Sequence, residues 1–222
     1  MKIDIISLFP GFFLGPLKTS ILGRAIEKKL VEVNLVDLRV FGEGARKKVD
    51  DTPYGGGPGM VLMPGPLVAA IESVKTETSK VVYMSPQGKP LKSADCERFA
   101  TCEHLIIVCG HYEGIDQRVI ENYIDEEISI GDFILTSGMP AALCLLDAVA
   151  RFIPSVLGDE TSNQTETFKE GVFEGPQYTK PPEFRGCKVP DVLLNGNHQK
   201  IAAWRANKAL EKMGKIRPDL LH

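Results

Sequence analysis

Short apolar segments alternate with helical patterns through the first 150 residues, and this alternation constrains the fold more than any other feature of the chain. Strands are predicted at residues 3–8, 33–37, 81–84, 105–109 and 128–135. Helices are predicted at residues 19–29, 67–74, 91–101, 117–123 and 140–152. This order predicts an α/β domain with a mostly parallel sheet. Residues 105–109 are continuously apolar, which indicates that helices cover both faces of the sheet.

The chain changes character near residue 158. Residues 158–167 read GDETSNQTET and show no apolar periodicity, which predicts a mobile linker. A passage rich in glycine and proline follows, and a helix is predicted at residues 197–213. We therefore predict a main domain at 1–157, a flexible linker at 158–170 and a small, mainly helical domain at 171–222.

Charge is distributed unevenly along the chain. The net charge of −3 alone argues against a nucleic-acid-binding protein. Residues 180–222, however, contain nine Lys and Arg against four Asp and Glu, a local charge of +5, which leaves the rest of the chain at −8. A basic tail on an acidic body fits a protein whose smaller part contacts phosphate. It fits equally well an ordinary solvated helix with lysines on one face.

The five cysteines are odd in number and show no C-x-x-C spacing. Together with four scattered histidines they indicate neither a zinc site nor a disulfide framework, so reduced thiols in a cytoplasmic protein are expected. No apolar run reaches the roughly 20 residues of a membrane span, so no membrane contact is predicted. The apolar residues 1–10 contain Asp4 and no small-residue cleavage site, so they are expected to form a strand rather than a signal peptide.

Three predicted strands lead into glycine-bearing loops. The strand at 81–84 runs into residues 85–88 (SPQG), the strand at 105–109 into residues 110–118 (GHYEGIDQR), and the last strand contains Gly131 and precedes Gly138. Ligands of open α/β sheets bind beyond the carboxyl ends of strands, where glycine lets the backbone come close to them. Each glycine alone is better explained by a tight turn, but three such loops at strand ends shift the balance toward a ligand site.

Other glycine patterns exclude common sites. The chain has no Walker-type phosphate loop, no G-x-G-x-x-G between a strand and a helix, and no G-x-S-x-G nucleophile elbow. Residues 54–60 (YGGGPGM) are too rich in glycine for a helix or strand. We expect a loop there that presents its backbone or against which another segment packs.

Several segments together resemble the bacterial tRNA (guanine-N1)-methyltransferase family, the TrmD type of trefoil-knotted SPOUT methyltransferases. They are residues 50–60 (DDTPYGGGPGM), 85–88 (SPQG), 109–118 (CGHYEGIDQR), 125–135 (DEEISIGDFIL), 147–154 (DAVARFIP) and 196–205 (GNHQKIAAWR). They occur in the family's order and cover nearly the whole chain. Any one of them alone is a weak signal, whereas the set is specific.

The resemblance implies that the sheet domain at 1–157 carries a deep trefoil knot, binds S-adenosyl-L-methionine and is catalytic. It also implies a homodimer whose active sites are completed by both subunits, and a tRNA-binding role for the domain at 171–222. The residues implied to bind the cofactor lie in the three glycine-bearing loops: Tyr83, Met84, Ser85, Pro86, Gly110, Glu113, Gly114, Ile130, Gly131, Asp132, Phe133, Ile134, Leu135, Ser137 and Gly138. Those implied to contact tRNA are Tyr112, Asp116, Arg118, His198 and Arg205.

The implied reaction is methylation of N1 of the guanine 3′ of the anticodon, guanine 37. Guanine N1 carries a proton and is weakly nucleophilic, so a general base must remove the proton and a cation must stabilise the charge that grows on O6. The family's arginine for O6 corresponds to Arg151, and its base, an aspartate of the linker, corresponds to Glu166. Asp159 and Glu160 are the nearest alternative bases.

The chain departs from the family's pattern at three positions. Glu166 replaces an aspartate, Ser137 replaces a glycine, and Met139 replaces a glutamate. Ser137 borders the cofactor loop, where its side chain is expected to crowd the methionine part of the cofactor. Family members are also linked to Mg²⁺, which Glu113 and Glu166 could hold together with substrate oxygens, although no dedicated metal site is visible.

Two other functions stay open at this point. A related knotted methyltransferase acting on another RNA site would lack the linker and the carboxyl-terminal segments, and both are present here. A catalytically impaired protein that only binds cofactor or RNA is supported by the three departures alone. A generic α/β metabolic enzyme has no triad, metal cluster or phosphate loop to support it.

Overall fold

The computed structural model describes residues 1–158, 167 and 173–220. The chain divides into two compact units, which we call the amino-terminal unit (Met1–Gly158) and the carboxyl-terminal unit (Asp159–His222). None of the helices within the described ranges is long and apolar enough to cross a membrane.

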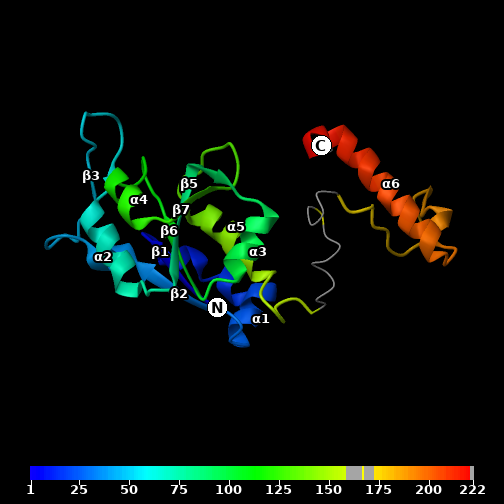
Figure 1. Cartoon of the computed structure of the whole chain (residues 1–222), viewed down its shortest axis with the longest axis horizontal. Coiled ribbons are helices and arrows are strands. Elements are labelled where there is room, and N and C mark those ends of the chain that lie inside the picture. The colour runs from blue at the N-terminus through cyan, green and yellow to red at the C-terminus, as the bar shows by residue number, and fades with distance from the viewer. Residues whose placement is uncertain (159–166, 168–172, 221–222) are drawn as a thin grey trace. The chain divides into compact units, whose positions relative to one another are not determined.

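The amino-terminal unit contains a five-stranded, entirely parallel sheet with the strand order β2-β1-β6-β5-β7 (Figure 1). Its strands are β1 (Lys2–Ser7), β2 (Glu32–Asp37), β5 (Ser79–Pro90), β6 (His104–Cys109) and β7 (Glu126–Ser129). A two-stranded antiparallel ladder of β3 (Asp50–Asp51) and β4 (Val61–Leu62) lies outside this sheet. The predicted α/β fold with a mostly parallel sheet is confirmed.

The helices are α1 (Ser20–Glu27), α2 (Pro64–Val74), α3 (Ser93–Ala100), α4 (Gln117–Tyr123) and α5 (Met139–Ala150). Short 3₁₀ turns, η1 (Pro10–Phe13), η2 (Pro16–Lys18) and η3 (Leu38–Phe41), connect β1 to α1 and follow β2. Proline stands in the first turn of both α2 and α5, where its missing N–H group costs no helical hydrogen bond. All five helices overlap the ranges predicted for them.

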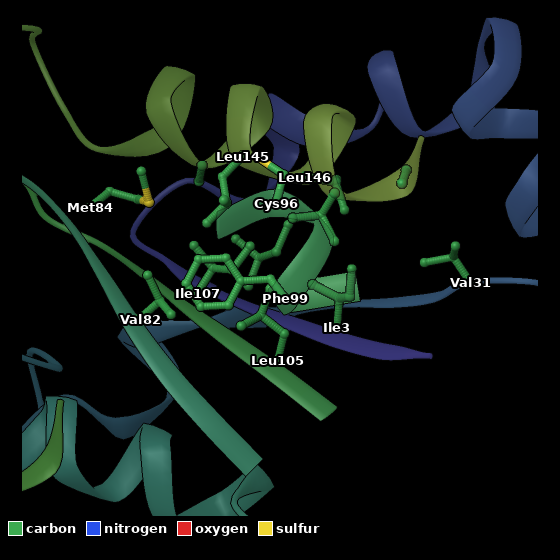
Figure 2. Packing of buried hydrophobic residues seen from close by; sticks show 14 of the residues in the cluster. Ile3, Val31, Val82, Met84, Cys96, Phe99, Leu105, Ile107, Leu145 and Leu146 are labelled. Carbon is green, nitrogen blue, oxygen red and sulfur yellow. The ribbon is translucent and has the colours of Figure 1, made fainter. Parts of the chain in front are cut away.

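Each central strand is apolar on both faces, because helices cover both sides of the sheet (Figure 1). In β6, Leu105 and Ile107 pack with α1, α3 and α5, whereas Ile106 and Val108 point the other way and pack with α2 and α4. Figure 2 shows the first cluster, with Leu145 and Leu146 of α5 directed at Phe99 and the strands beneath. The alternation of side chains along a strand thus explains why residues 105–109 read as a continuous apolar run.

A buried polar network joins three neighbouring strands at their amino ends. His104 of β6 contacts Asp4 of β1 through Nε2 (2.5 Å to Oδ2) and Ser79 of β5 through Nδ1 (2.7 Å to Oγ). Lys2 adds an ion pair to Asp4 with Nζ 3.1 Å from Oδ2. Buried polar groups are tolerated when their hydrogen bonds are satisfied, so this network fixes the register of β1, β6 and β5.

The carboxyl-terminal unit is built around α6 (His198–Ile216), with a small antiparallel ladder of β8 (Glu183–Phe184) and β9 (Cys187–Lys188). The 3₁₀ turns η5 (Asp191–Leu193) and η6 (Pro218–Leu220) flank the helix. Asn197 caps α6, because its Oδ1 accepts a hydrogen bond from the backbone N–H of Lys200 at 3.0 Å. The helix runs three residues beyond the predicted end at Met213.

Candidate cofactor cavity

A cavity of about 390 Å³ lies where the loops after β6 and β7 and an excursion within β5 come together. This volume is within the range of small-molecule sites, and the carboxyl ends of parallel strands are where such sites occur. Its walls are formed by Tyr83, Met84, Ser85, Pro86, Gln87, Gly110, His111, Tyr112, Glu113, Gly114, Ile128, Ser129, Ile130, Gly131, Phe133, Ile134, Leu135, Ser137, Gly138 and Ala141.

All the residues predicted to bind the cofactor, except Asp132, line this one cavity. Gln87, His111, Ile128, Ser129 and Ala141 also line it and were not predicted. The first four lie within the loops and the last strand predicted from the sequence, so including every residue of those segments would have found them. Ala141 lies in the first turn of α5, and its position became visible only in the folded chain.

The segment at residues 85–88 interrupts the pairing of β5 with β7. Met84 and Lys89 both pair with Ile128, so the four residues between them leave the ladder, and the first three of them line the cavity. A Cβ atom on Gly88 would lie 2.5 Å from the backbone carbon of Glu127, which no backbone shift relieves cheaply. Glycine at this position therefore allows the chain to return to β5 after the excursion.

The loop after β6 is held against the loop before α5 by their backbones. Gly138 donates its N–H to the carbonyl of Gly110 at 2.8 Å, and His111 pairs with Ser137 in an isolated β-bridge. A Cβ atom on Gly138 would lie 2.8 Å from the nitrogen of Gly110. This wall of the cavity is therefore backbone packed on backbone, with no room for a side chain between the loops.

Residues 130–135 are irregular, and the prediction of a strand through residue 135 is wrong. β7 ends at Ser129, whose Oγ accepts the N–H of Gly131 at 3.2 Å and donates to its carbonyl at 3.0 Å. Gly131 has a φ of 150°, and a Cβ atom there would meet the ring of Phe133. The Ser129 hydroxyl and this glycine end the strand, and the apolar residues that follow line the cavity instead of a sheet.

Tyr83 is the largest side chain of the cavity floor that is almost fully buried. Its phenol packs against Gly110, where a Cβ atom would lie 2.8 Å from the hydroxyl oxygen. Burial, and to a lesser extent the charge of Glu127, raises the pKa of Tyr83 to about 12. The phenol is therefore neutral at physiological pH, and the floor of the cavity carries no charge from it.

The glycine-rich segment at residues 54–60 forms the loop between β3 and β4 and adjoins the cavity rim. Glu113 donates its N–H to the carbonyl of Met60 at 3.0 Å, and its side chain covers Gly59, which has a φ of 78°. Leu62 in turn donates to the carbonyl of Gly114 at 3.0 Å. Two loops distant in sequence thus form one rim. Of the two expectations for residues 54–60, the structure shows the second, a loop against which another segment packs.

Of the residues predicted to contact tRNA, Tyr112 lines the cavity while Asp116 and Arg118 begin α4 close by. Asp116 caps that helix, and its carboxylate receives both Nε and Nη2 of Arg118 at 2.8 Å. The hydrogen bonds from the Arg118 side chain, the largest cause, hold the pKa of Asp116 below its usual value. His198 and Arg205 lie on α6 in the carboxyl-terminal unit, apart from the cavity residues in the chain.

The structure describes one of the two residues predicted to be catalytic, Arg151. Arg151 follows the last residue of α5, and its side chain is half-buried. Glu166 and the alternatives Asp159 and Glu160 lie outside the described ranges. Across those ranges no three His, Cys, Asp or Glu side chains are grouped to hold a metal ion.

The two departures inside the amino-terminal unit fit its local structure. Ser137 is buried, and its Oγ accepts the N–H of Met139 at 3.4 Å, so the hydroxyl is bonded within its own turn. Met139 begins α5 and packs against the core cluster of α1, α3 and α5. These contacts account for how both side chains are accommodated beside the cavity.

Comparison with known proteins identifies the family. The tRNA (Guanine-1)-methyltransferase TrmD family matches residues 1–222, and the chain belongs to this family, which confirms the resemblance of the motifs. A protein named tRNA (guanine-N(1)-)-methyltransferase from Protochlamydia amoebophila is 55% identical over 221 residues, 100% of both chains. Its namesake from Chlamydia pneumoniae is 56% identical over 220 residues, 99% of this chain and 61% of that protein. The namesake from Chlamydia trachomatis serovar D is 53% identical over 220 residues and is matched over 62% of its length.

Proposed function

We propose that this member of the tRNA (guanine-1)-methyltransferase family transfers a methyl group from S-adenosyl-L-methionine to N1 of guanine 37, the guanine 3′ of the anticodon in tRNA. One observation carries the proposal: the glycine-bearing loops after β6 and β7 and the excursion in β5 form a single cavity in a chain that matches the family from residue 1 to residue 222.

The residues of the cavity fit the proposed cofactor. The Gly110–Gly138 wall presents backbone groups, the floor is the neutral Tyr83, and the exposed apolar residues 133–135 form one side. Such a surface suits a ligand with a flat base and a chain that contains a sulfonium centre. When bound, the cofactor supplies an electrophilic methyl group whose leaving group is neutral and needs no acid.

The reaction also needs a base for the proton of guanine N1 and a cation for the charge on O6, and we assign both roles to residues other than those that line the cavity. Glu166 is proposed to remove the proton from guanine N1, and Arg151 to stabilise the negative charge on O6. A glutamate has nearly the same intrinsic acidity as an aspartate but is one methylene longer. Arg151 follows the carboxyl end of α5, whereas the first turn of that helix lines the cavity, so its role is proposed from the family's pattern, in a site that both subunits of the proposed homodimer complete.

The substrate side is proposed to include Tyr112, Asp116 and Arg118 on the amino-terminal unit and His198 and Arg205 on α6. The local charge of +5 in residues 180–222 supports contact with phosphate. We also propose a cytoplasmic homodimer with a trefoil knot, in which residues 158–170 act as a flexible linker and Glu113 with Glu166 binds Mg²⁺ where the reaction uses it.

The experiment incubates the purified protein with labelled S-adenosyl-L-methionine and an unmodified tRNA transcript carrying G36 and G37. The expected product is label at guanine 37, and a transcript with adenine at position 37 is the control. Label at another position would favour a related knotted methyltransferase. Cofactor binding without any label transfer would favour the catalytically impaired alternative.

The base is tested by Glu166→Gln, with Glu160→Gln as the matched control in the same segment. Loss of a general base typically lowers turnover about 10²- to 10⁴-fold, and we expect cofactor affinity to be unchanged. Equal turnover in Glu166→Gln and wild type would assign the base elsewhere, and a loss in Glu160→Gln instead would identify the residue.

A further inference from the structure

The hairpin of β8 and β9 carries an exposed aromatic side chain beside a guanidinium group. Phe184 is 61% exposed, and Cζ of Arg185 lies 5.3 Å from the centre of its ring. Phe184 is paired across the ladder with Cys187, which is also exposed, so its small neighbour on that face leaves the ring open. The ring and the guanidinium group over it are thus both open to solvent in the described part of the carboxyl-terminal unit.

Arg185 occupies a turn position whose positive φ angle other residue types adopt with less strain. Arg185 and Gly186 both have positive φ values, 51° and 81°, as a two-residue turn between twisted strands requires. Glycine, asparagine and aspartate favour such positions, whereas a long side chain adopts them at a cost. The geometry of the turn therefore does not call for arginine, and its presence points to a role of the side chain itself.

The charge around the ring indicates what kind of partner it meets. Residues 180–188 contain Lys180, Arg185 and Lys188 against one acidic residue, Glu183. Glu183 and Lys188 form an ion pair across the ladder, with Oε2 3.8 Å from Nζ, on the face opposite to that of Phe184. Exposed lysines are depleted from the centres of protein interfaces. Aromatic rings and arginine planes surrounded by cations are instead what RNA-binding modules use to stack unpaired bases beside phosphates.

We propose that Phe184 and Arg185 form a stacking surface for an unpaired base of the RNA substrate, with the guanidinium of Arg185 and Lys180, nearby in the chain, supplying positive charge for the adjacent phosphates. The inference rests on the proposed function, which supplies an RNA whose anticodon loop contains unpaired bases. The inference names the residues through which the carboxyl-terminal unit would bind that RNA. Stacking is tolerant of base identity, so this surface contributes affinity rather than sequence selection.

The test compares Phe184→Ala, Phe184→Tyr and Arg185→Gly in the full-length protein. We expect Phe184→Ala to raise the Kd for the tRNA transcript about 5- to 100-fold, the range that one stacked base contributes, and Phe184→Tyr to stay near wild type. Arg185→Gly suits the positive φ and removes the guanidinium, so we expect weaker binding and a smaller dependence of Kd on salt. In turnover, KM for tRNA should rise while kcat and the Kd for S-adenosyl-L-methionine stay constant.

Leu210→Ala is the matched control, since Leu210 is an exposed apolar residue of the same unit and lies outside the hairpin. Wild-type tRNA affinity in Phe184→Ala would overturn the inference, and so would an equal loss in Leu210→Ala. A lowered melting temperature or a change of oligomeric state in Phe184→Ala would assign the ring to packing within the protein. If the wild type binds tRNA through Phe184 but transfers no methyl group, the proposed function fails and the stacking surface stands; if it binds no RNA, both fail.

Discussion

The two units differ most in how much apolar surface they bury. The amino-terminal unit has a sheet with a cluster of buried side chains on each face. In the described part of the carboxyl-terminal unit, Ala209 and Met213 are the buried apolar residues. Because stability comes mainly from apolar burial, the first unit can hold a cavity in a fixed shape, whereas the second has little to fix its own. A rigid cavity suits cofactor chemistry, and a thinly packed basic unit suits an irregular RNA surface.

The largest expected effect is the loss of stability when a core side chain of the amino-terminal unit is removed. Phe99 is fully buried on α3, at the centre of the cluster in Figure 2. Phe99→Ala should lower the free energy of unfolding by about 3–5 kcal/mol, measured by denaturant unfolding. Met213→Ala is the counterpart in the second unit and should change this main transition far less. Equal losses would show that the two units unfold as one.

The second prediction concerns the backbone wall of the cavity. Gly138→Ala adds a Cβ atom 2.8 Å from the nitrogen of Gly110, so the loops must separate. We expect at least a tenfold loss of affinity for S-adenosyl-L-methionine in calorimetric titration, with a stability loss of about 1–3 kcal/mol from overpacking. Gly11→Ala is the control, because no atom lies within 4 Å of the added Cβ. Unchanged binding in Gly138→Ala would mean that the wall is not rigid.

The third prediction uses the pKa of the cavity floor. Burial raises the pKa of Tyr83 to about 12, above the unfolded value near 10, so the native state holds this proton more tightly. Its contribution, roughly 2–3 kcal/mol at most, is fully present below pH 10 and is lost as the pH rises from 10 to 12. Ultraviolet titration should show one tyrosine ionising late, and Tyr83→Phe should abolish that step. Ionisation of all tyrosines near pH 10 would contradict the buried position.

The smallest effect is expected at the surface. The hydrogen bonds from Arg118 lower the pKa of Asp116, so Arg118→Ala should raise that pKa toward its usual value, which carboxyl chemical shifts in an NMR titration will show. The depressed pKa stabilises the native state above the unfolded pKa of Asp116, and this contribution is lost as the pH falls through the folded pKa. Because solvent screens an exposed pair, the melting temperature should hardly move. A large drop would place Asp116 and Arg118 in the folded core of the first unit.

The sequence predicted the elements whose burial pattern is unambiguous. β6 differs by one residue from the predicted strand, because a short apolar run between polar ends has few alternatives in a sheet covered on both faces. The strand predicted through residue 135 failed for a physical reason. An apolar run reads the same whether it faces a sheet or a ligand cavity, and the hydrogen bonds from Ser129 to Gly131 that end β7 are formed by a side chain.

For the candidate site, the glycine-bearing loops could be predicted from the sequence pattern, but the pattern could not predict that they line one cavity. The contact of Gly138 with Gly110 and the cover of Gly59 by Glu113 join segments far apart in the chain, so no local pattern predicts them. Their likeness to a family's motifs supplied that information instead. The same likeness implies catalytic roles for Glu166 and Arg151, which the experiments above test.

The backbone wall formed by Gly110 and Gly138 also bears on inhibition of this protein. Hydrogen-bonding groups of the main chain are the same whatever residue carries them, and a side chain added at either glycine enters the cavity wall itself. If the cavity binds the cofactor as proposed, a competitive inhibitor packed against this wall meets a surface that mutation cannot remodel without moving the two loops apart. Escape from such a compound is confined to other side chains that line the cavity, such as Phe133 and Ile134.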